Sequence, residues 1–307
     1  MNAIAMPLTP VKPSWRTRAM AGNAGPVTVI VFAIIVLWYV GAVMMNWSGV
    51  SQRLERGGQE TSFSTVLPLT LSDQRPLLPA PHQIVVELKN TVIDVAPTSR
   101  RSLIHHSYVT LSATLVGFAI GSLLGILLAV GIVHVRTLDK SLMPWVISSQ
   151  TIPILAIAPI IVVVLGSIGI RGLMPKAIIS AYLCFFPVTI GMVKGLTSPD
   201  KLSLDLMRTY SASRWATFWK LRMPASVPYL FASLKVAVAI SLVGAIVAEL
   251  PTGAQAGLGA RLLAGSYYGQ TIQIWSALVA AAVVAAGLVM LIGRIEIFVN
   301  RLMGARQ

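Results

Sequence analysis

Lys235 and Glu249 are ionisable side chains that lie within or beside a long apolar run of this sequence. Lys235 falls inside the run 229–248, and Glu249 directly follows it. Ionisable residues at such a depth in a membrane are functional candidates by default. For Lys235, a functional role and snorkelling of the ammonium group to the membrane surface are equally compatible with the sequence. For Glu249, pairing with Arg261, lining of an outer gate and unpaired interfacial placement all stay open.

A polar patch interrupts another apolar run, 142–165. It comprises Ser148, Ser149, Gln150 and Thr151, and Pro153 follows it. Polar side chains in lipid face other helices or a water-filled cavity. Hydrogen bonding between helices is one interpretation. Lining of a translocation path is the other, and Pro153 favours it because a proline frees a carbonyl within the membrane.

The remaining chemistry-bearing residues do not form a catalytic or metal-binding pattern. His105 and His106 are adjacent, and no other His or Cys stands at metal-ligand spacing from them. The single cysteine, Cys184, excludes an internal disulfide and is expected to be a small buried hydrophobe. The phosphate-binding pattern G-x-x-x-x-G-K-[ST] is missing from the sequence. We therefore predict no enzyme activity, no cofactor and no metal site.

The composition points to lipid as the solvent of this chain. Of its 307 residues, 55% are hydrophobic and only 11% are charged, whereas soluble domains carry roughly 25% charged residues. The formal net charge of +14 fits basic loops at the cytoplasmic face of a membrane. The sequence has no basic stripe of the kind that binds nucleic acid, so no nucleic-acid partner is expected.

The apolar runs predict an all-α membrane protein with six transmembrane helices, because a hydrocarbon core of ~30 Å needs about twenty helical residues. The runs span residues 26–45, 108–135, 142–165, 175–193, 229–248 and 274–299. The first is interpreted as a retained anchor, since its apolar stretch is longer than that of a signal peptide. The second is rich in Gly and Ala, and small residues spaced three or four apart predict close packing against a neighbouring helix. Its glycines are Gly117, Gly121 and Gly125, which stand four apart, and Gly131.

The distribution of Lys and Arg in the short loops predicts a cytoplasmic N-terminus. The expected location is the bacterial inner membrane, which the chain crosses several times. The expected organisation is a cytoplasmic tail 1–25, a first transmembrane helix 26–45, a periplasmic loop 46–106, a five-helix core 107–299 and a cytoplasmic tail 300–307. An amphipathic helix within 82–95 is expected to lie on the membrane surface. Segment 46–76 carries no motif that assigns it a role.

The cytoplasmic loop 198–228 is the most informative polar segment. Apolar and aromatic residues recur in it at helical intervals among basic ones. Ser211 and Ser213 are expected to cap a second short helix that begins near Arg214. Interfacial anchoring and docking into a soluble partner's groove both explain such a helix pair.

This loop resembles the coupling loop of permeases of binding-protein-dependent ABC importers, in their nitrate, taurine and aliphatic-sulfonate branch. That branch reads roughly E-x-A-R-x-x-G-A-S-x-x-x-x-F and then Leu-Pro. The matching positions here are Arg208, Ala212, Ser213, Phe218 and Pro224, whereas Asp205 is a shorter acid and Met207 and Ser211 depart from Ala and Gly. If that turn needs a positive φ, serine costs energy there that glycine does not. Further similarities at 77–81, 151–153, 158–159, 248–249 and 257–259 extend the resemblance over residues 77–303.

The resemblance implies a permease subunit that forms the translocation path, with ATP hydrolysed on a separate subunit. Its implied partners are two ABC ATPase copies, a second permease copy or paralogue, and a periplasmic substrate-binding protein. The implied substrate is a small solute of the nitrate, sulfonate or taurine type. An ion-coupled secondary transporter is the alternative, but the sequence shows no obvious internal repeat and almost no acidic residue inside a span, whereas that class often has repeated halves and several buried carboxylates.

Overall fold

The computed structural model describes residues 24–251 and 253–304, and all regular structure in these ranges is helical. The expected tail 1–25 lies almost entirely outside the described residues, as does the end of the tail 300–307. The chain divides into two compact units, residues 1–85 and 86–307. The expected all-α fold is therefore confirmed over the described part of the chain.

The first unit contains α2 (Ala24–Arg56), α3 (Phe63–Leu71) and the start of α4 (Pro81–Val92). Helix α2 continues well beyond residue 45, where the sequence analysis ended it. The cause is packing, because Val50 and Leu54 of its polar continuation form a small buried cluster with Val66 of α3. The stretch 46–76, which carried no motif, thus contains a helix end and a second short helix.

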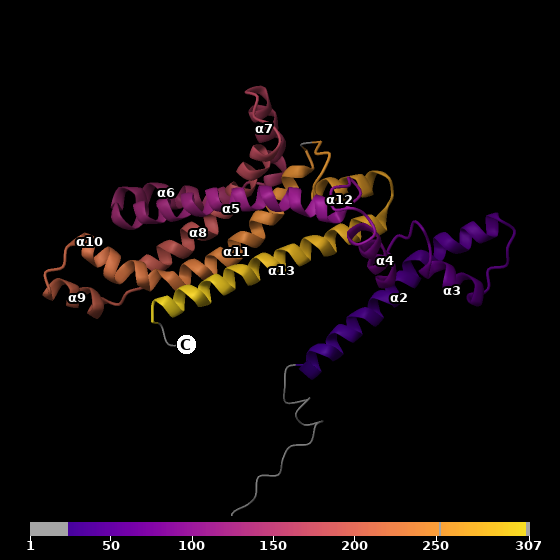
Figure 1. Ribbon diagram of the computed structural model, residues 1–307, viewed down its shortest axis with the longest axis horizontal. Helices are drawn as coiled ribbons and strands as arrows, with labels where there is room; N and C mark the ends of the chain where they lie inside the picture. Colours follow the sequence, from indigo (N-terminus) through magenta and orange to yellow (C-terminus); the bar gives the residue numbers. More distant parts are fainter. Residues whose placement is uncertain (1–23, 252, 305–307) are drawn as a thin grey trace, which may run out of the picture. The chain divides into compact units, whose positions relative to one another are not determined.

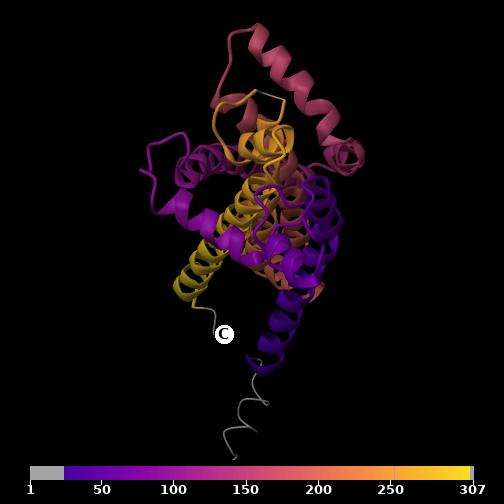
Figure 2. The same ribbon diagram turned by 90° about the vertical axis from the view of Figure 1, so that its right-hand side faces the viewer.

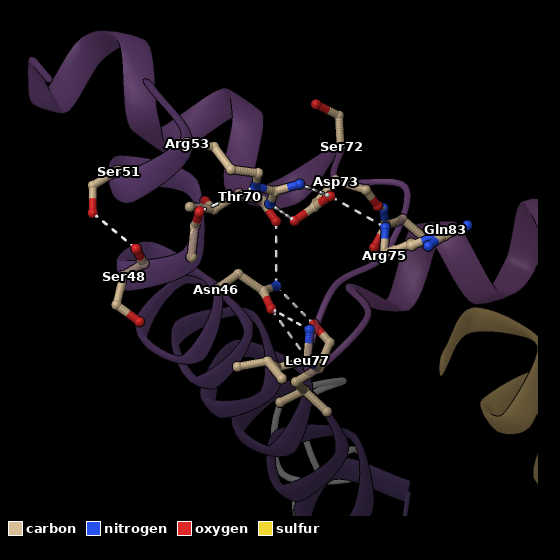
Figure 3. A network of polar contacts seen from close by, with 12 residues as sticks. Asn46, Ser48, Ser51, Arg53, Thr70, Ser72, Asp73, Arg75, Leu77 and Gln83 are labelled. Carbon is tan, nitrogen blue, oxygen red and sulfur yellow. Dashed lines mark hydrogen bonds and ion pairs between the residues drawn. The ribbon is translucent and has the colours of Figure 1, made fainter. Parts of the chain in front are cut away.

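Hydrogen bonds fix the segment that follows α3 (Figure 3). The buried Asn46 amide donates to the carbonyl oxygens of Thr70 (3.3 Å) and Leu78 (2.9 Å), and its Oδ1 accepts from the Leu77 N–H at 2.7 Å. Arg53 of α2 forms an ion pair with Asp73. Burial alone raises the pKa of Asp73, but hydrogen bonds, chiefly from Arg53, outweigh it and bring the pKa below its ordinary value. One asparagine and one ion pair therefore hold this irregular segment against α2.

The second unit contains the remaining helices, several of them long and apolar. They are α5 (Leu103–His134), α6 (Arg136–Ser148), η1 (Ser149–Thr151), α7 (Ile154–Ser167), α8 (Leu173–Leu196), α9 (Lys201–Thr209), α10 (Arg214–Thr217), the π-helix η2 (Phe218–Arg222), α11 (Met223–Glu249), α12 (Leu258–Tyr267) and α13 (Thr271–Leu302). Over the described residues of both units, 5 helices are long and apolar enough to cross a membrane, or 6 if α6 and α7 form one broken span. The expected helix in the 82–95 region is present as α4, and its place on a membrane surface stays a prediction.

The third predicted span, 142–165, is not one straight helix. It divides into α6 and α7, which are bent by 101° at a short break. Pro153 lies at this break with an extended backbone, ψ 115°, and a proline cannot donate the hydrogen bond that would continue the helix. Helix α7 consequently projects away from the other helices of its unit (Figures 1 and 2), with side chains such as Leu155 and Val163 exposed.

The core of the second unit is built where α5 crosses α8, and glycines make this crossing close. A Cβ atom at Gly117 would lie 2.5 Å from the Cβ of Ser180, and one at Gly125 would lie 2.7 Å from the carbonyl oxygen of Phe185. Gly121 approaches Ala181 and the buried Cys184 in the same way. The predicted close packing is thus confirmed for three of the four glycines, while Gly131 faces α6 instead.

Hydroxyl groups join α11 to this pair of helices. The Ser180 hydroxyl of α8 donates to the carbonyl oxygen of Ser241 at 2.7 Å, and the Ser241 hydroxyl donates to that of Thr114 in α5 at 3.0 Å. Hydrogen bonds of this kind hold helices together in lipid, where the hydrophobic effect between helices is weak. Helix α13 lies along α11 and completes the layer (Figure 1).

The substitution Gly117→Ala is expected to destabilise the purified protein, because overpacking a tight contact costs about 1–3 kcal/mol. Gly287→Ala is the matched control, since α13 leaves nothing within 4 Å of a Cβ at that helical glycine. Thermal unfolding in one detergent compares the two variants. Equal melting temperatures would show that close approach of α5 and α8 does not require Gly117.

Candidate functional site

The first candidate site is the loop between α8 and α11, which begins with two capped helices. The Asp200 side chain accepts a hydrogen bond from the N–H of Ser203 at 2.9 Å and caps α9. The exposed Asp200 has a pKa below its ordinary value because Ser203 donates to the carboxylate. Ser213 caps α10 by accepting from the N–H of Ala216 at 3.1 Å, as predicted. Ser211 does not take part in this cap.

Ser211 instead closes the end of α9 with a left-handed backbone. Its φ of +50° is the only positive value among the described non-glycine residues. The turn is held by two bonds, from Ser211 N–H to the carbonyl oxygen of Arg208 (2.8 Å) and from Ala212 N–H to that of Met207 (2.9 Å). Glycine is the usual residue at such helix ends. The turn therefore has the positive φ that the glycine of the resembling family suggests, and here a serine adopts it.

The loop exposes one apolar surface and buries another. Leu202, Leu206, Tyr210, Trp215 and Trp219 are exposed. Phe218 is 6% exposed and packs with Ala129 of α5 and with Met192 and Leu196 of α8. Asp205 and Arg208 form an exposed ion pair at 3.0 Å on α9, and Pro224 lies in the first turn of α11. The loop is thus anchored to the spans through Phe218 while most of its large side chains remain available to a partner.

The second candidate site surrounds Glu249, which is completely buried at the end of α11. Its carboxylate accepts from the Thr110 hydroxyl at 2.9 Å and from the Gly259 N–H at 2.7 Å. Lys176 of α8 provides the opposite charge, with Nζ 3.6 Å from Oε1. Burying a charge is expensive unless it is paired and hydrogen-bonded, and here both conditions are met. Of the three alternatives that the sequence left open for Glu249, pairing with Arg261 and unpaired placement are not what the structure shows, since Lys176 is the partner.

Glycines bring the segment before α12 against this carboxylate. Gly257 has φ 133°, and a Cβ there would lie 2.2 Å from the Glu249 carboxyl carbon. The next residue, Leu258, donates its N–H to the Thr110 hydroxyl at 2.8 Å. His106 also belongs to this network, since its Nδ1 accepts from the Gly257 N–H at 3.0 Å. The network joins α5, α8, α11 and α12 around one carboxylate.

Arg261 pairs with a different acid. Its Nη2 lies 3.6 Å from Oε1 of Glu87 in α4, and both side chains are mostly buried. Burial raises the pKa of Glu87, while the positive charge of Arg261 opposes that rise. Burial likewise lowers the pKa of Arg261 against the opposing effect of Glu87. The arginine thus links α12 to α4 and does not reach Glu249.

Lys235 forms an ion pair with Glu296, which joins α11 to α13. Its side chain is 35% exposed and that of Glu296 is 20% exposed. The ion pair gives this lysine a partner, and the choice between a functional role and snorkelling stays a prediction. Sequence reasoning missed both Lys176 and Glu296 as partners, although a buried acid always calls for a nearby base or hydrogen-bond donors.

The polar patch of the third span lies at the bend between α6 and α7. The hydroxyls of Ser149 and Thr151 donate to carbonyl oxygens three residues earlier in the chain, at 2.7 and 2.8 Å. The Tyr182 hydroxyl of α8 donates to the Ser149 carbonyl oxygen at 2.6 Å. Gln150, Thr151 and Pro153 are exposed. Their role in a translocation path stays a prediction.

No group of three or more His, Cys, Asp or Glu side chains is placed to hold a metal ion within residues 24–251 and 253–304. His106, one of the adjacent histidines, instead bonds backbone groups of Gly257 and Arg100. The two candidate sites offer charge pairs, hydrogen bonds and exposed apolar side chains. Such groups can bind a partner or join helices that move together. Long apolar helices with such sites define a multi-pass membrane protein.

Comparison with known proteins gives the family of this membrane protein. The family described as binding-protein-dependent transport system inner membrane component matches residues 121–303, more than half of the chain. The chain belongs to this family and is the permease subunit of an ABC importer. The matched region contains the loop with α9 and α10 as well as Glu249, whereas the first unit lies outside it.

Three relatives illustrate the range of the family. The formylaminopyrimidine transport permease protein of Halalkalibacterium halodurans is 33% identical over 60% of this chain and 68% of its own length. The riboflavin transport system permease protein of Chloroflexus aurantiacus is 30% identical over 62% of this chain and 69% of its own. The nitrate import permease protein of Leptolyngbya laminosa is 29% identical over 56% of this chain and 62% of its own length. This membership replaces the secondary transporter considered from the sequence, and it implies an ATPase partner and a substrate-binding protein.

The substitution Ser211→Gly is expected to stabilise the loop by about 1 kcal/mol, because glycine adopts positive φ without the steric cost that serine bears. Hydrogen–deuterium exchange of the backbone amides in α9 measures this local effect. Ser203→Gly is the control, since Ser203 lies within α9 and a glycine there destabilises a helix. Faster exchange in Ser211→Gly than in the wild type would contradict the strained turn.

The substitution Glu249→Gln is expected to destabilise the protein by about 3–5 kcal/mol, because Lys176 would keep its charge in a buried site without a carboxylate. The double variant Glu249→Gln/Lys176→Met should regain part of that loss. Thermal unfolding of the wild type, of the single variants Glu249→Gln and Lys176→Met, and of the double variant gives the coupling between the two residues. Strictly additive effects would show that the pair does not interact. Asp205→Asn is the control, since its ion pair is exposed and should contribute little.

Proposed function

We propose that this permease forms the translocation path for a small solute and couples the path to ATP hydrolysis through residues 205–224. The observation that carries the proposal is the loop between α8 and α11, which presents exposed apolar helices and is anchored to the spans by Phe218. Amphipathic helices of this kind fit a groove of a partner protein. The partner proposed here is the ABC ATPase, in two copies.

Phe218 supplies the mechanical link in this proposal. Its ring packs between the end of α5 and the end of α8, and Arg222 donates to the Leu196 carbonyl oxygen of α8 at 3.2 Å. A shift of α9 and α10 would therefore act on both spans at once. The coupling is of the rigid-body kind, in which a displacement at an interface moves packed helices together.

The second permease is proposed to cover α7. Many apolar side chains of α7 are exposed. Figure 1 shows that this helix projects away from α5 and α8. A second copy of this chain or a paralogue would bury this surface. The path would then run between the two permeases, past the bend at Ser149, Gln150, Thr151 and Pro153.

The opposite end of the unit is proposed to face the periplasm and the substrate-binding protein, in the inner membrane of a bacterium with the N-terminus in the cytoplasm. Glu249 and Lys176 would act there as a fixed point of the outer gate, because their network joins α5, α8 and α11 to the segment before α12. Lys235 and Glu296 would keep α13 against α11 while the path changes its access.

The substrate is proposed to be a small solute carried by the binding protein. Nitrate, sulfonate and taurine are the types suggested by the sequence motifs. The relatives named for formylaminopyrimidine and riboflavin add small heteroaromatic compounds. Uptake of radiolabelled nitrate, taurine and riboflavin into cells with and without this permease distinguishes these types.

The substitution Asp205→Lys is expected to abolish co-purification of the ATPase with the tagged permease, because it reverses a charge on exposed α9 and leaves Arg208 beside a second positive charge. Pull-down in mild detergent, followed by identification of the bound proteins, is the measurement. Asp94→Lys is the matched control, since Asp94 is also exposed but lies between α4 and α5. A wild-type permease that is folded yet brings no ATPase would contradict the proposed coupling loop.

A further inference from the structure

A basic cavity of about 480 Å³ lies between the loop and the end of α5. Its lining includes His134 of α5, Arg208 of α9, Arg214 of α10 and Arg222 of η2, and it contains no Asp or Glu. These residues come from four separate elements, so the fold gathers positive charge that is dispersed in the sequence. Such a cavity attracts an anion and offers it hydrogen-bond donors.

Two of the arginines bond to neighbouring groups and keep further donors free. Arg222 Nη1 donates to the Leu196 carbonyl oxygen at 3.2 Å, and Arg208 Nη1 donates to Asp205 at 3.0 Å. A guanidinium carries five N–H donors in a planar fork, which suits the oxygens of a phosphate group. A single phosphate at the cavity would thus meet guanidinium donors from more than one element.

A second, apolar cavity of about 220 Å³ adjoins the basic one. It is lined by Val130, Trp215 and Phe218, and it shares His134 and Arg214 with the basic cavity. The His134 ring stands edge-on to the Phe218 ring, with centroids 5.0 Å apart. A ligand that fits both cavities carries a negative group and an apolar group side by side.

The position of the paired cavities agrees with such an amphiphile. They lie where the apolar helix α5 ends and where the span that leads into α11 begins. The ends of membrane-spanning helices lie near the lipid headgroups, and basic side chains there attract anionic ones. The basic residues Arg136 and Lys140 line another open cavity at the start of the adjacent helix α6.

We propose that the paired cavities bind an anionic phospholipid. Its phosphate contacts Arg214 and Arg222, and the beginning of an acyl chain lies against Trp215 and Phe218. The lipid thus supports the same aromatic side chain that anchors the loop to α5 and α8. This inference concerns the permease chain alone and does not depend on the proposed ATPase contact.

The test uses the full chain purified in detergent, mixed with equal amounts of phosphatidylglycerol and phosphatidylcholine and examined by native mass spectrometry. The wild type is expected to retain phosphatidylglycerol preferentially. Arg214→Gln and Arg222→Gln should each lower the retained phosphatidylglycerol by about tenfold, since each removes charge-assisted hydrogen bonds to the phosphate. Lys220→Gln is the matched control, because Lys220 is an exposed base of the same π-helix that does not line either cavity.

Each other outcome overturns the proposal. Equal retention of the two lipids by the wild type would mean that no anionic-lipid site exists. An equal loss in Lys220→Gln would mean that only the general positive charge of the loop matters. If inorganic phosphate at millimolar concentration displaced phosphatidylglycerol completely while phosphatidic acid bound no better than phosphate, the site would bind a free anion. Gel filtration of every variant separates lost binding from lost folding. Arg214→Lys is added as a variant that keeps the positive charge at this position.

Discussion

The structure depends on one constraint, which is that polar groups removed from water inside a membrane must find their partners within the chain. The crossing of α5, α8 and α11 meets this constraint with hydroxyls that donate to neighbouring backbones, from Ser180 to Ser241 and from Ser241 to Thr114. These bonds form only because glycines let the helices approach closely. In this bundle, the close packing of the helices and the hydrogen bonding of their buried polar groups therefore depend on the same glycines.

The same constraint explains the surroundings of Glu249. A buried carboxylate in an apolar environment requires both charge compensation and donors, and α8, α5 and the start of α12 each supply one of them. Gly257 and Gly259 leave the room that a side chain would take from the carboxylate. A single acid thereby fixes the path of the chain between α11 and α12.

Several features were predictable because they follow from short-range patterns. The apolar runs located the long helices, and the glycine spacing of α5 predicted its tight contact. The capping role of Ser213 followed from its residue type. The backbone at Ser211 was foreseeable only through the family pattern, since serine itself gives no sign of positive φ. The partners Lys176 and Glu296 were not foreseen, because they lie far away in sequence from Glu249 and Lys235. The bend at Pro153 was also missed, since proline is tolerated in many membrane helices and its effect depends on the neighbours.

Cys184 has a practical consequence. The sequence contains no other thiol, and this one is buried where α8 meets α5. Maleimide reagents react with accessible thiols, so the natural chain is expected to react with them very little. Single cysteines introduced on α9 or α12 can therefore be labelled with spin labels or fluorophores without first replacing Cys184. Distances between the two ends of the bundle become measurable in the native sequence plus one or two substitutions.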